Sequence, residues 1–324
     1  FAGVKIFESA TVDTNILLFS KSDNQHETVC AVTNKQNKDS VKNLSDFVQQ
    51  QNSICDFNSS DSWVILSPIE QSIKRKIEAV GTPLKDWDIQ INYGIKTGFN
   101  DAFIISTEKR NEILANCKTE DERQRTAELI RPILRGRDIK RYGYVDNGLY
   151  LINTHNGVRG RIPRVKIEDY PAVKAHLDQY WDRIATRADK GDTPYNLRNC
   201  AYLEDFSRPK IVYQELTQGS TFAIDEDGTY MVSNTAYLIT GEHLDYLLKI
   251  LNSYILEYIY RTFYATMLGT NGIRWLAQHI VKLPIPKYTN SVIHQSIINE
   301  TNPDNYIAQL YGITDCELDF IRSV

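Results

Sequence analysis

Short apolar segments alternate with polar turns and with a few amphipathic helices, and this mixture restricts the fold most strongly. Strands are predicted around residues 87–93, 102–105, 149–152, 210–215, 221–224 and 236–239. The sequence DEDG at 225–228 lies between two apolar segments and is typical of a hairpin turn. No repeat of fixed period is visible. The pattern predicts an α+β fold with a mixed sheet and packed helices.

Three helices are expected among these strands. The first begins after Ser67, with Pro68 at its first position, and stops at Gly81. The second covers 170–191, and the third covers 242–264, where Leu, Ile and Tyr recur at spacings of three and four. That spacing indicates an amphipathic helix facing the core. No apolar run approaches 18 residues, so neither a transmembrane helix nor membrane association is expected.

Composition shifts suggest how the chain is organised. The segment TNILLFSK at 14–21 is predicted to be a buried strand, although the following sequence offers it no obvious neighbours. We therefore expect residues 1–21 to be the end of a larger domain that has been cut away. Residues 22–60 are rich in Asn, Gln, Asp and Ser and are expected to form a polar linker or surface loop. The main domain is predicted at 61–290, with a C-terminal helical segment at 291–324.

Charge and cysteine content restrict the partners and the compartment. The net charge is -4, but nine Lys or Arg and only two Asp occur between residues 131 and 166. A phosphate backbone responds to the local field of one face, so this basic region keeps a nucleic-acid partner open. The five cysteines are far apart and include no CxxC pair, which indicates reduced, structural thiols in a cytoplasmic protein.

Catalytic signatures are missing from the sequence. It contains no GxGxxG motif after a strand, no P-loop, no HExxH and no GxSxG. Its six histidines have no spacing typical of metal ligands, and carboxylate pairs such as Glu204 with Asp205 fall in predicted turns. We predict no catalytic residue and no metal site within these 324 residues.

Two kinds of binding feature remain. The stretch INYGIKTGFNDAFII at 91–105 combines two glycines with donor side chains, which suits a loop facing DNA but equally a plain hairpin connection. Two basic clusters, RGRDIKR and GVRGRIPRVK, suit phosphate or guanine recognition, with a solvated charged turn as the alternative. The predicted DNA-binding residues of these features are Lys96, Thr97, Asn100, Arg135, Arg137, Lys140, Arg141, Arg159, Arg161, Arg164 and Lys166.

Base-reading residues are expected where rigid elements end in short polar loops. Gln214 and Thr217 follow the apolar strand KIVY, and Asn271 and Arg274 follow the long helix at 242–264. Amide side chains can pair with adenine and guanidinium groups with guanine. Loops that merely close strands and helices are the alternative for each of these residues.

Five motifs occur in a fixed order along the chain: WDIQINYGIKTGFNDAFII (87–105), IRPILRGRDIKRY (130–142), FSRPKIVYQE (206–215), LLKILNS (247–253) and LPIP (283–286). Together they resemble the C-terminal target-recognition region of TaqI-type adenine-N6 DNA methyltransferases, including type IIG restriction-modification enzymes. The resemblance implies that the main domain recognises a specific sequence in double-stranded DNA. It also implies that residues 1–21 are the last strand region of a truncated α/β methyltransferase domain.

Several functional expectations follow from this resemblance. Phe7 would take the place of an aromatic residue that holds a flipped adenine. The family's glycine-containing S-adenosylmethionine motif and its Asn-Pro-Pro-Tyr/Phe motif are both absent here. We therefore expect S-adenosylmethionine to bind the parent enzyme, in an upstream methyltransferase domain of the same chain, and no cofactor to bind these residues. These residues alone should neither methylate nor cut DNA.

Two further functions stay open. The chain could serve a phage-defence methyltransferase that has no linked nuclease, because the recognition part would look much the same. Alternatively, it could be a protein-interaction module in which the helical segment around 293–324, including TDCELDFIRS, docks onto a partner subunit.

Overall fold

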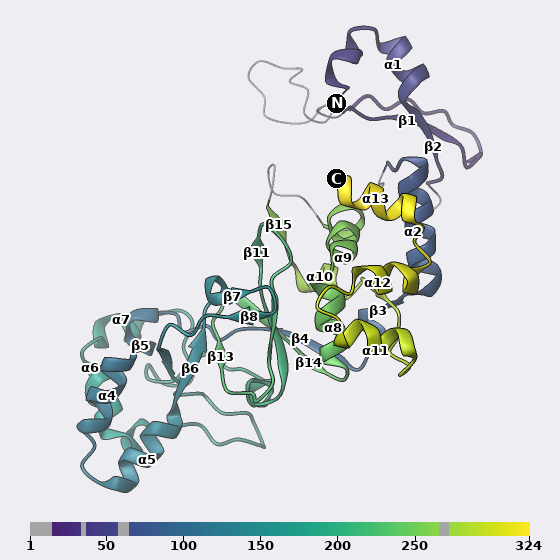
Figure 1. Cartoon of the computed structure of the whole chain (residues 1–324). Helices are drawn as coiled ribbons and strands as arrows, with labels where there is room; N and C mark the ends of the chain where they lie inside the picture. Colours follow the sequence, from purple (N-terminus) through teal and green to yellow (C-terminus); the bar gives the residue numbers. More distant parts are fainter. Residues whose placement is uncertain (1–14, 34–36, 58–64, 266–271) are drawn as a thin grey trace. The chain divides into compact units, whose positions relative to one another are not determined.

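The structure is a computed structural model that describes residues 15–33, 37–57, 65–265 and 272–324, with only the backbone given for Lys38 and Ser40 (Figure 1). The chain divides into two compact units, Phe1–Lys76 and Ile77–Val324. The boundary lies within helix α2 (Pro68–Val80), which begins at the predicted position. Glu70 accepts hydrogen bonds from the N–H and the hydroxyl of Ser67, both at 2.7 Å, which closes the first turn.

The first unit contains a small antiparallel ladder of β1 (Thr28–Ala31) and β2 (Asn52–Cys55). A 3-10 helix (Lys38–Lys42) and α1 (Leu44–Gln51) precede β2, so the predicted polar connection at 22–60 contains regular structure. The buried strand predicted at 14–21 is wrong for the described residues 15–21, which form no strand, and the side chains of 16–19 are exposed. An apolar run becomes a strand only where its backbone finds a pairing partner.

An antiparallel four-stranded sheet lies at the centre of the second unit. Its order is β12 (Phe222–Asp225), β10 (Lys210–Gln214), β14 (Ala236–Gly241) and β4 (Ile89–Tyr93). Because β4 and β10 both pair antiparallel with β14, their C-terminal ends lie beside the N-terminal end of β14, at the same end of the sheet. We call this end of the sheet, together with the chain segments that leave the strands there, the loop end.

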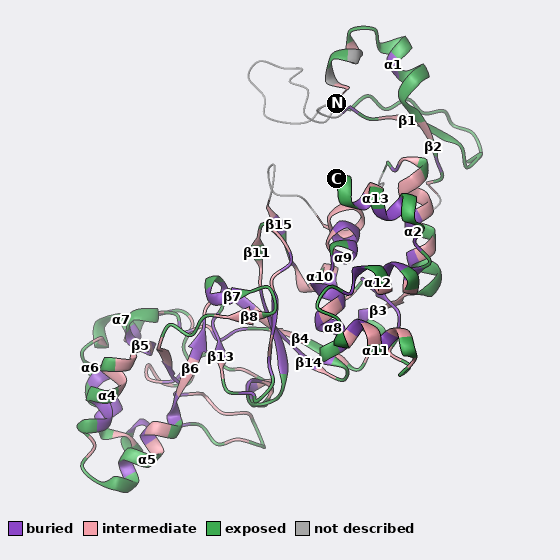
Figure 2. Cartoon of the chain, in the orientation of Figure 1, coloured by how far each residue is buried: buried purple, intermediate pink, exposed green. Residues whose placement is uncertain are grey.

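A second four-stranded sheet has the order β13 (Met231–Val232), β6 (Ile130–Leu134), β9 (Leu149–Ile152) and β5 (Ile104–Ser106). It is mixed, because β13 runs parallel to β6 while the other pairs are antiparallel. The predicted mixed α+β architecture is thus confirmed. The helices between residues 100 and 186 are α3 (Asn100–Phe103), α4 (Thr107–Ala115), α5 (Glu120–Leu129), α6 (Pro171–Asp178) and α7 (Trp181–Thr186). A cluster of buried hydrophobic residues is drawn from these helices and the strands, and the corresponding parts of the ribbon carry the buried colour in Figure 2.

The hairpin predicted at 225–228 is wrong, because β12 and β13 belong to different sheets. The carboxylate of Asp225 accepts hydrogen bonds from the N–H groups of Thr229 and Tyr230, at 3.1 and 2.9 Å. Arg131 donates to the carbonyl groups of Gly228 and Thr229, both at 3.0 Å. These contacts direct the chain toward β6 instead of back along β12.

The two long predicted helices are each divided. Residues 170–191 form α6 and α7, with a break after Asp178. Residues 242–264 form α8 (Leu244–Leu251), α9 (Tyr254–Ile259) and a π-helix (Tyr260–Tyr264). The hydroxyl of Ser253 accepts from the N–H of Leu256 at 3.1 Å, which starts α9 as a separate helix. The core-facing character predicted for this region is confirmed, since most of α8 and α9 is buried.

The remaining pairs and helices complete the second unit. The pairs are β3 (Thr82–Pro83) with β16 (Pro284–Ile285), β7 (Ile139–Lys140) with β8 (Gly143–Tyr144), and β11 (Leu216–Thr217) with β15 (Ile273–Arg274). The later helices are α10 (Ala277–Ile280), α11 (Val292–Asn299), α12 (Asp304–Tyr311) and α13 (Asp315–Ser323), and 3-10 turns occupy Leu84–Asp86, Gly136–Asp138, Ile167–Asp169 and Leu203–Ser207. Among the described residues, no helix is both long and apolar enough to cross a membrane.

Candidate nucleic-acid interface

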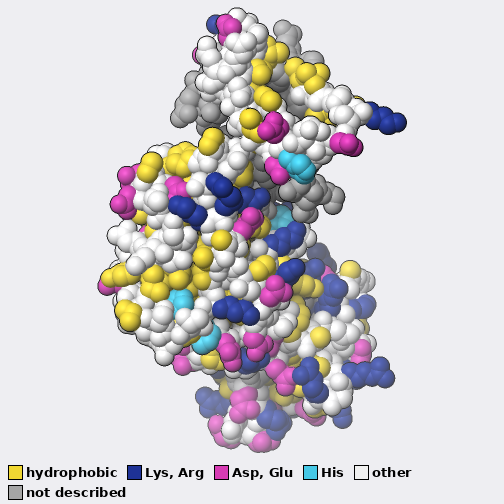
Figure 3. Space-filling view, turned by 90° about the vertical axis from the view of Figure 1, so that its right-hand side faces the viewer, with side chains coloured by type: hydrophobic (Ala, Val, Ile, Leu, Met, Phe, Trp, Pro, Cys, Tyr) yellow, Lys and Arg dark blue, Asp and Glu magenta, His cyan; other side chains and the backbone are white. Residues whose placement is uncertain are grey.

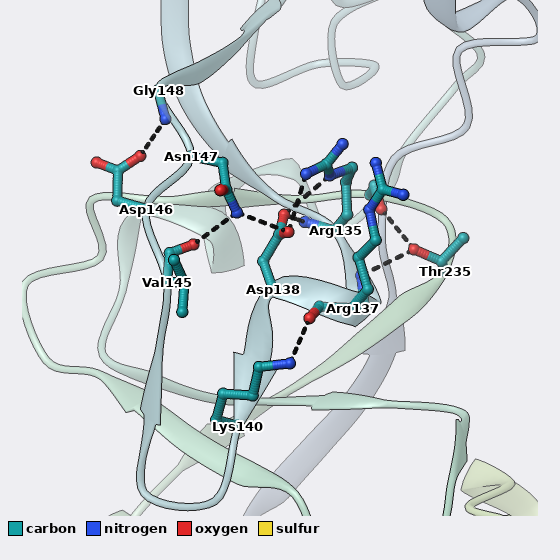
Figure 4. Close-up of polar contacts among 11 residues, drawn as sticks. Arg135, Arg137, Asp138, Lys140, Val145, Asp146, Asn147, Gly148 and Thr235 are labelled. Carbon is teal, nitrogen blue, oxygen red and sulfur yellow. Dashed lines mark hydrogen bonds and ion pairs between the residues drawn. The ribbon is translucent and has the colours of Figure 1, made fainter.

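Three chain segments meet on one turn at the loop end, residues 233–236, which we call the central turn. The N–H of Gly94, just after β4, donates to the carbonyl of Ala236 at 2.9 Å. The N–H of Gly136, just after β6, donates to the hydroxyl of Thr235 at 2.9 Å (Figure 4). Gln214, the last residue of β10, pairs with Ala236 across the sheet. Segments far apart in the sequence are therefore held together here.

The glycines of the 91–105 stretch are explained by this packing. A Cβ atom on Gly94 would lie 2.0 Å from the carbonyl oxygen of Ser233, so only glycine lets the two backbones approach. Gly98 has φ +71°, and a Cβ there would lie 2.9 Å from the carbonyl oxygen of Asp189. Both glycines serve contacts within the protein.

The predicted DNA-binding residues of this loop lie in different environments. Thr97 is 3% exposed, and its hydroxyl donates to the side-chain oxygen of Asn100 at 2.6 Å. Asn100 itself is exposed at the start of α3. Lys96 is half-buried, with its ammonium group 5.6 Å from the centre of the Tyr93 ring. Of the three, Lys96 carries the positive charge, and the N–H of its neighbour Ile95 donates to the carbonyl of Val232, just before the central turn, at 2.7 Å.

Arg187 is a buried residue whose role was not predicted from the sequence. Its contacts hold this loop in place. Within the described residues, its guanidinium group donates to backbone carbonyls alone, those of Thr97, Asp189, Pro194 and Asn196. It also lies 4.3 Å from the centre of the Phe103 ring. Burial lowers the pKa of Arg187 to about 10, so the group remains charged at neutral pH. No local sequence signal distinguishes it from a surface arginine.

The first basic cluster contains an internal ion pair. The Arg135 guanidinium donates to both carboxylate oxygens of Asp138, each at 3.0 Å, and Asn147 donates to the same carboxylate at 3.0 Å (Figure 4). Burial alone would raise the pKa of Asp138, but the hydrogen bonds from Arg135 and Asn147 lower it on balance. Arg135 is therefore committed to a contact within the protein.

The other cations of this cluster differ in the contacts that their side chains make within the protein. Arg141 donates to the carbonyl of Asn252 at 2.6 Å and lies against the rings of Tyr142 and Tyr254. Lys140 donates to the carbonyl of Arg137 at 2.8 Å. The Arg137 side chain is exposed and has no hydrogen bond or ion pair within the described ranges of the chain. Its guanidinium points to the same side as that of Arg135 (Figure 4).

The second basic cluster surrounds a surface depression of about 640 Å³. Arg161 pairs with Glu204 at 2.6 Å, and Arg164 pairs with Asp192 at 3.0 Å. Arg159 and Lys166 are exposed, and neither has a polar side-chain partner in the described part of the chain. Half of the predicted positive charge here is thus balanced internally.

The residues predicted to read bases lie at or beside the loop end where they are described. Gln214 adjoins Gly136, whose Cβ would lie 3.0 Å from Gln214 Cγ. The hydroxyl of Thr217 accepts from Trp275 Nε1 at 3.2 Å and is half-buried. Arg274 is 47% exposed and donates from Nε to Glu215 at 2.6 Å. Asn271 and Phe7 lie outside the described residues.

Sequence reasoning missed Asn234, which occupies the exposed tip of the central turn. Its only sequence signal is the turn-forming run Ser-Asn-Thr. On the face shown in Figure 3, Lys and Arg side chains are interspersed with Asp and Glu, so positive charge is not concentrated there.

Part of the chain matches a known domain family, and two curated proteins are similar to the chain. Residues 131–285 match the TaqI-like C-terminal specificity domain. The type II methyltransferase M.BstVI of Geobacillus stearothermophilus is 22% identical over 281 residues, which cover 82% of this chain and 47% of that protein. The type II methyltransferase M.PaeR7I of Pseudomonas aeruginosa is 23% identical over 239 residues, covering 72% and 38%. The chain thus spans about half or less of the length of these relatives.

Two solved structures also align with the chain. The type IIL restriction-modification enzyme MmeI in complex with DNA aligns with a TM-score of 0.49 and 12% identity, over 84% of this chain and 39% of that one. The type IIG restriction endonuclease BpuSI aligns with a TM-score of 0.48 and 13% identity, over 79% and 32%.

Proposed function

We propose that this chain, whose residues 131–285 match the TaqI-like C-terminal specificity domain, recognises a specific sequence in double-stranded DNA. The recognised site would serve an adenine-N6 methyltransferase or a fused restriction-modification enzyme. Homology to type II methyltransferases about twice as long supports this proposal. Methyl transfer from S-adenosylmethionine is then the task of a methyltransferase domain in the same enzyme, where Phe7 would stack against the flipped adenine.

The observation that carries the proposal is the convergence of separate segments on the central turn. It brings Gln214 and Asn234 to one end of the central sheet, and Arg274 follows on the adjoining ladder of β11 and β15. Amide and guanidinium groups are the side chains that pair with adenine and guanine edges. Base reading requires side chains held within hydrogen-bond distance, which a buried sheet and a tightly packed turn provide.

Phosphate contacts are assigned to the cations that have no internal ion pair. Arg137 has no acidic partner within the described residues, Arg159 is exposed at the depression of the second cluster, and Lys166 is an exposed residue of the same cluster. Such contacts fix position and supply salt-dependent affinity without choosing a sequence. Arg135, by contrast, is assigned a structural role through Asp138.

The proposal is tested by selection from a randomised duplex library with the purified 324-residue chain. We expect enrichment of one sequence motif, and binding that falls steeply as salt rises. A chain that neither enriches a motif nor binds DNA in a salt-dependent manner would overturn the proposal.

One alternative function is not favoured by the geometry of the C-terminal helices. A protein-docking role for residues 293–324 needs an apolar face that is free to bind. Instead, Ile297, Ile307 and Tyr311 are almost fully buried, and Leu318 and Ile321 of α13 are buried as well. A phage-defence methyltransferase without a nuclease would use the same recognition surface, so that alternative concerns only the enzyme in which the surface operates.

A further inference from the structure

We propose that Glu215 is a positioning residue that orients Arg274 to read a guanine edge; this inference rests on the proposed DNA-recognition function. Glu215 follows β10 directly, and Arg274 ends β15. Arg274 Nε donates to Glu215 Oε1 at 2.6 Å. The pair is partly exposed, with 47% of the Arg274 side chain and 23% of the Glu215 side chain accessible.

The carboxylate of Glu215 is itself held in place. The hydroxyl of Tyr237, the second residue of β14, approaches Glu215 Oε2 at 3.4 Å. Burial raises the pKa of Tyr237, and the neighbouring Glu215 raises it further, so the hydroxyl stays protonated and can donate at neutral pH. Tyr237 also stacks on Tyr213, with ring centres 5.2 Å apart and an interplanar angle of 14°. Glu215 is therefore braced by the central sheet.

The backbone of Arg274 is fixed as firmly. Its carbonyl accepts a hydrogen bond from the Tyr260 hydroxyl at 2.6 Å, and it pairs with Leu216 in the β11–β15 ladder. The next residue, Trp275, is fully buried and stacks on the Tyr260 ring at 4.1 Å. An arginine on such a backbone loses little further freedom when it binds, which favours precise contacts.

This arrangement leaves the outer edge of the guanidinium available. Nε is used by Glu215, whereas Nη1 and Nη2 have no hydrogen-bond partner in the described ranges. Two parallel N–H donors match O6 and N7 of guanine in the major groove. Because Glu215 balances the charge of Arg274 and its carboxylate repels phosphate, the pair suits a base edge better than the DNA backbone. Arg137, by contrast, has no acidic partner among the described residues, so its positive charge suits the DNA backbone better than a base edge.

The inference is tested with the 324-residue chain and the library selection described above. The variants are Glu215→Gln, Glu215→Ala, Arg274→Ala and the double variant Glu215→Ala with Arg274→Ala, and their melting temperatures identify any loss of folding. Glu204→Gln is the matched control, because it removes the acidic partner of another exposed arginine, Arg161.

We expect Arg274→Ala to lower the preference at one G·C pair of the motif by about tenfold or more. Glu215→Ala should lower the preference at the same pair, and the double variant should lose little more, because both changes remove one contact. Glu215→Gln keeps an oxygen acceptor for Arg274 Nε and should retain part of the preference. Glu204→Gln should leave the motif unchanged.

The outcomes separate this inference from the function on which it rests. A wild-type chain that enriches no motif would overturn the DNA-recognition function and this inference with it. A wild-type motif that survives unchanged in folded Glu215→Ala and Glu215→Gln would overturn the inference alone. So would losses at different base pairs in the Glu215 and Arg274 variants.

Discussion

Arg135 and Asp138 are joined by two hydrogen bonds of 3.0 Å, from Nε to Oδ2 and from Nη2 to Oδ1. Asp138 also accepts a hydrogen bond from the backbone N–H of Arg135 at 2.8 Å. Its carboxylate therefore closes the turn that contains Arg137. Two arginines separated by one residue therefore have different tasks. Arg135 builds the turn, whereas we propose that the exposed Arg137 contacts DNA.

Alanine substitutions should separate these two tasks. Arg135→Ala leaves the buried Asp138 carboxylate without its cation and should lower the free energy of unfolding by at least about 1.5 kcal/mol. Arg137→Ala should leave stability nearly unchanged, weaken binding to all duplexes similarly and reduce the salt slope by about one. Urea unfolding and fluorescence anisotropy at several salt concentrations measure the two effects. Equal effects of both variants on stability and on the salt slope would contradict this division.

The stabilisation by Asp138 should depend on pH. The pKa of Asp138 is lowered in the folded protein from an ordinary value of 3.8. Its ionised form is therefore preferred on folding, and the stabilisation is complete above pH 3.8 and is lost as pH falls through the lower folded pKa. The difference in unfolding free energy between wild type and Asp138→Asn should be constant from pH 5 to 7 and shrink below pH 3.8. A difference that does not change with acidification would show that the carboxylate charge is not what stabilises the turn.

The buried pair of Lys210 and Asp225 should be essential for folding. Their charged atoms are 2.5 Å apart, the two residues face each other across β10 and β12, and both are almost fully buried. Lys210→Met would leave the buried Asp225 carboxylate without its cation and should cost about 3 to 5 kcal/mol. Arg208→Met is the control, because Arg208 is 60% exposed and its ion pair with Asp205 should contribute less than about 1 kcal/mol. Similar losses in both variants, measured by urea unfolding, would be inconsistent with this account.

The close approach of Gly94 to Ser233 should tolerate no side chain. A Cβ at Gly94 would lie 2.0 Å from the Ser233 carbonyl oxygen, so Gly94→Ala must displace the central turn. We expect this variant to lose both stability and sequence preference. Gly143→Ala is the control, because no atom lies within 4 Å of a Cβ built there. A Gly94→Ala protein with the wild-type melting temperature and motif would show that the glycine is not required for packing.

Local patterns in the sequence located the four strands of the central sheet and the start of α2, but not elements such as β6, α4 and α5. Ser67 and Pro68 mark the start of α2, and the apolar segments at 149–152 and 210–215 coincide with β9 and β10. Strand partners were harder to predict, because the turn at 225–228 indicates a reversal without saying which strand comes next. The path to β13 depends on Arg131, nearly 100 residues earlier, which donates to the carbonyls of Gly228 and Thr229.

The candidate site was predictable in composition but not in the partners of its side chains. Asp138, three residues after Arg135, is a local hint of an internal pair, and Asn147 follows nine residues after Asp138, whereas Thr235 reaches the same turn from a distant segment. Gly94 and Gly98 looked like a ligand loop, although their contacts are with the protein backbone. Asn234 and Glu215 gain their significance only from the neighbours that the fold brings to them.

The most direct test of the central claim is photo-crosslinking from the central turn. A benzoylphenylalanine side chain placed at Asn234, which is exposed, is compared with the same group at Val292, which is 85% exposed on α11. With a duplex that carries the selected motif, the group at position 234 should crosslink to bases within the motif, and the group at 292 should not crosslink. Crosslinking from 292 alone, or no crosslink from 234 while the duplex is bound, would contradict the claim that the loop end reads DNA.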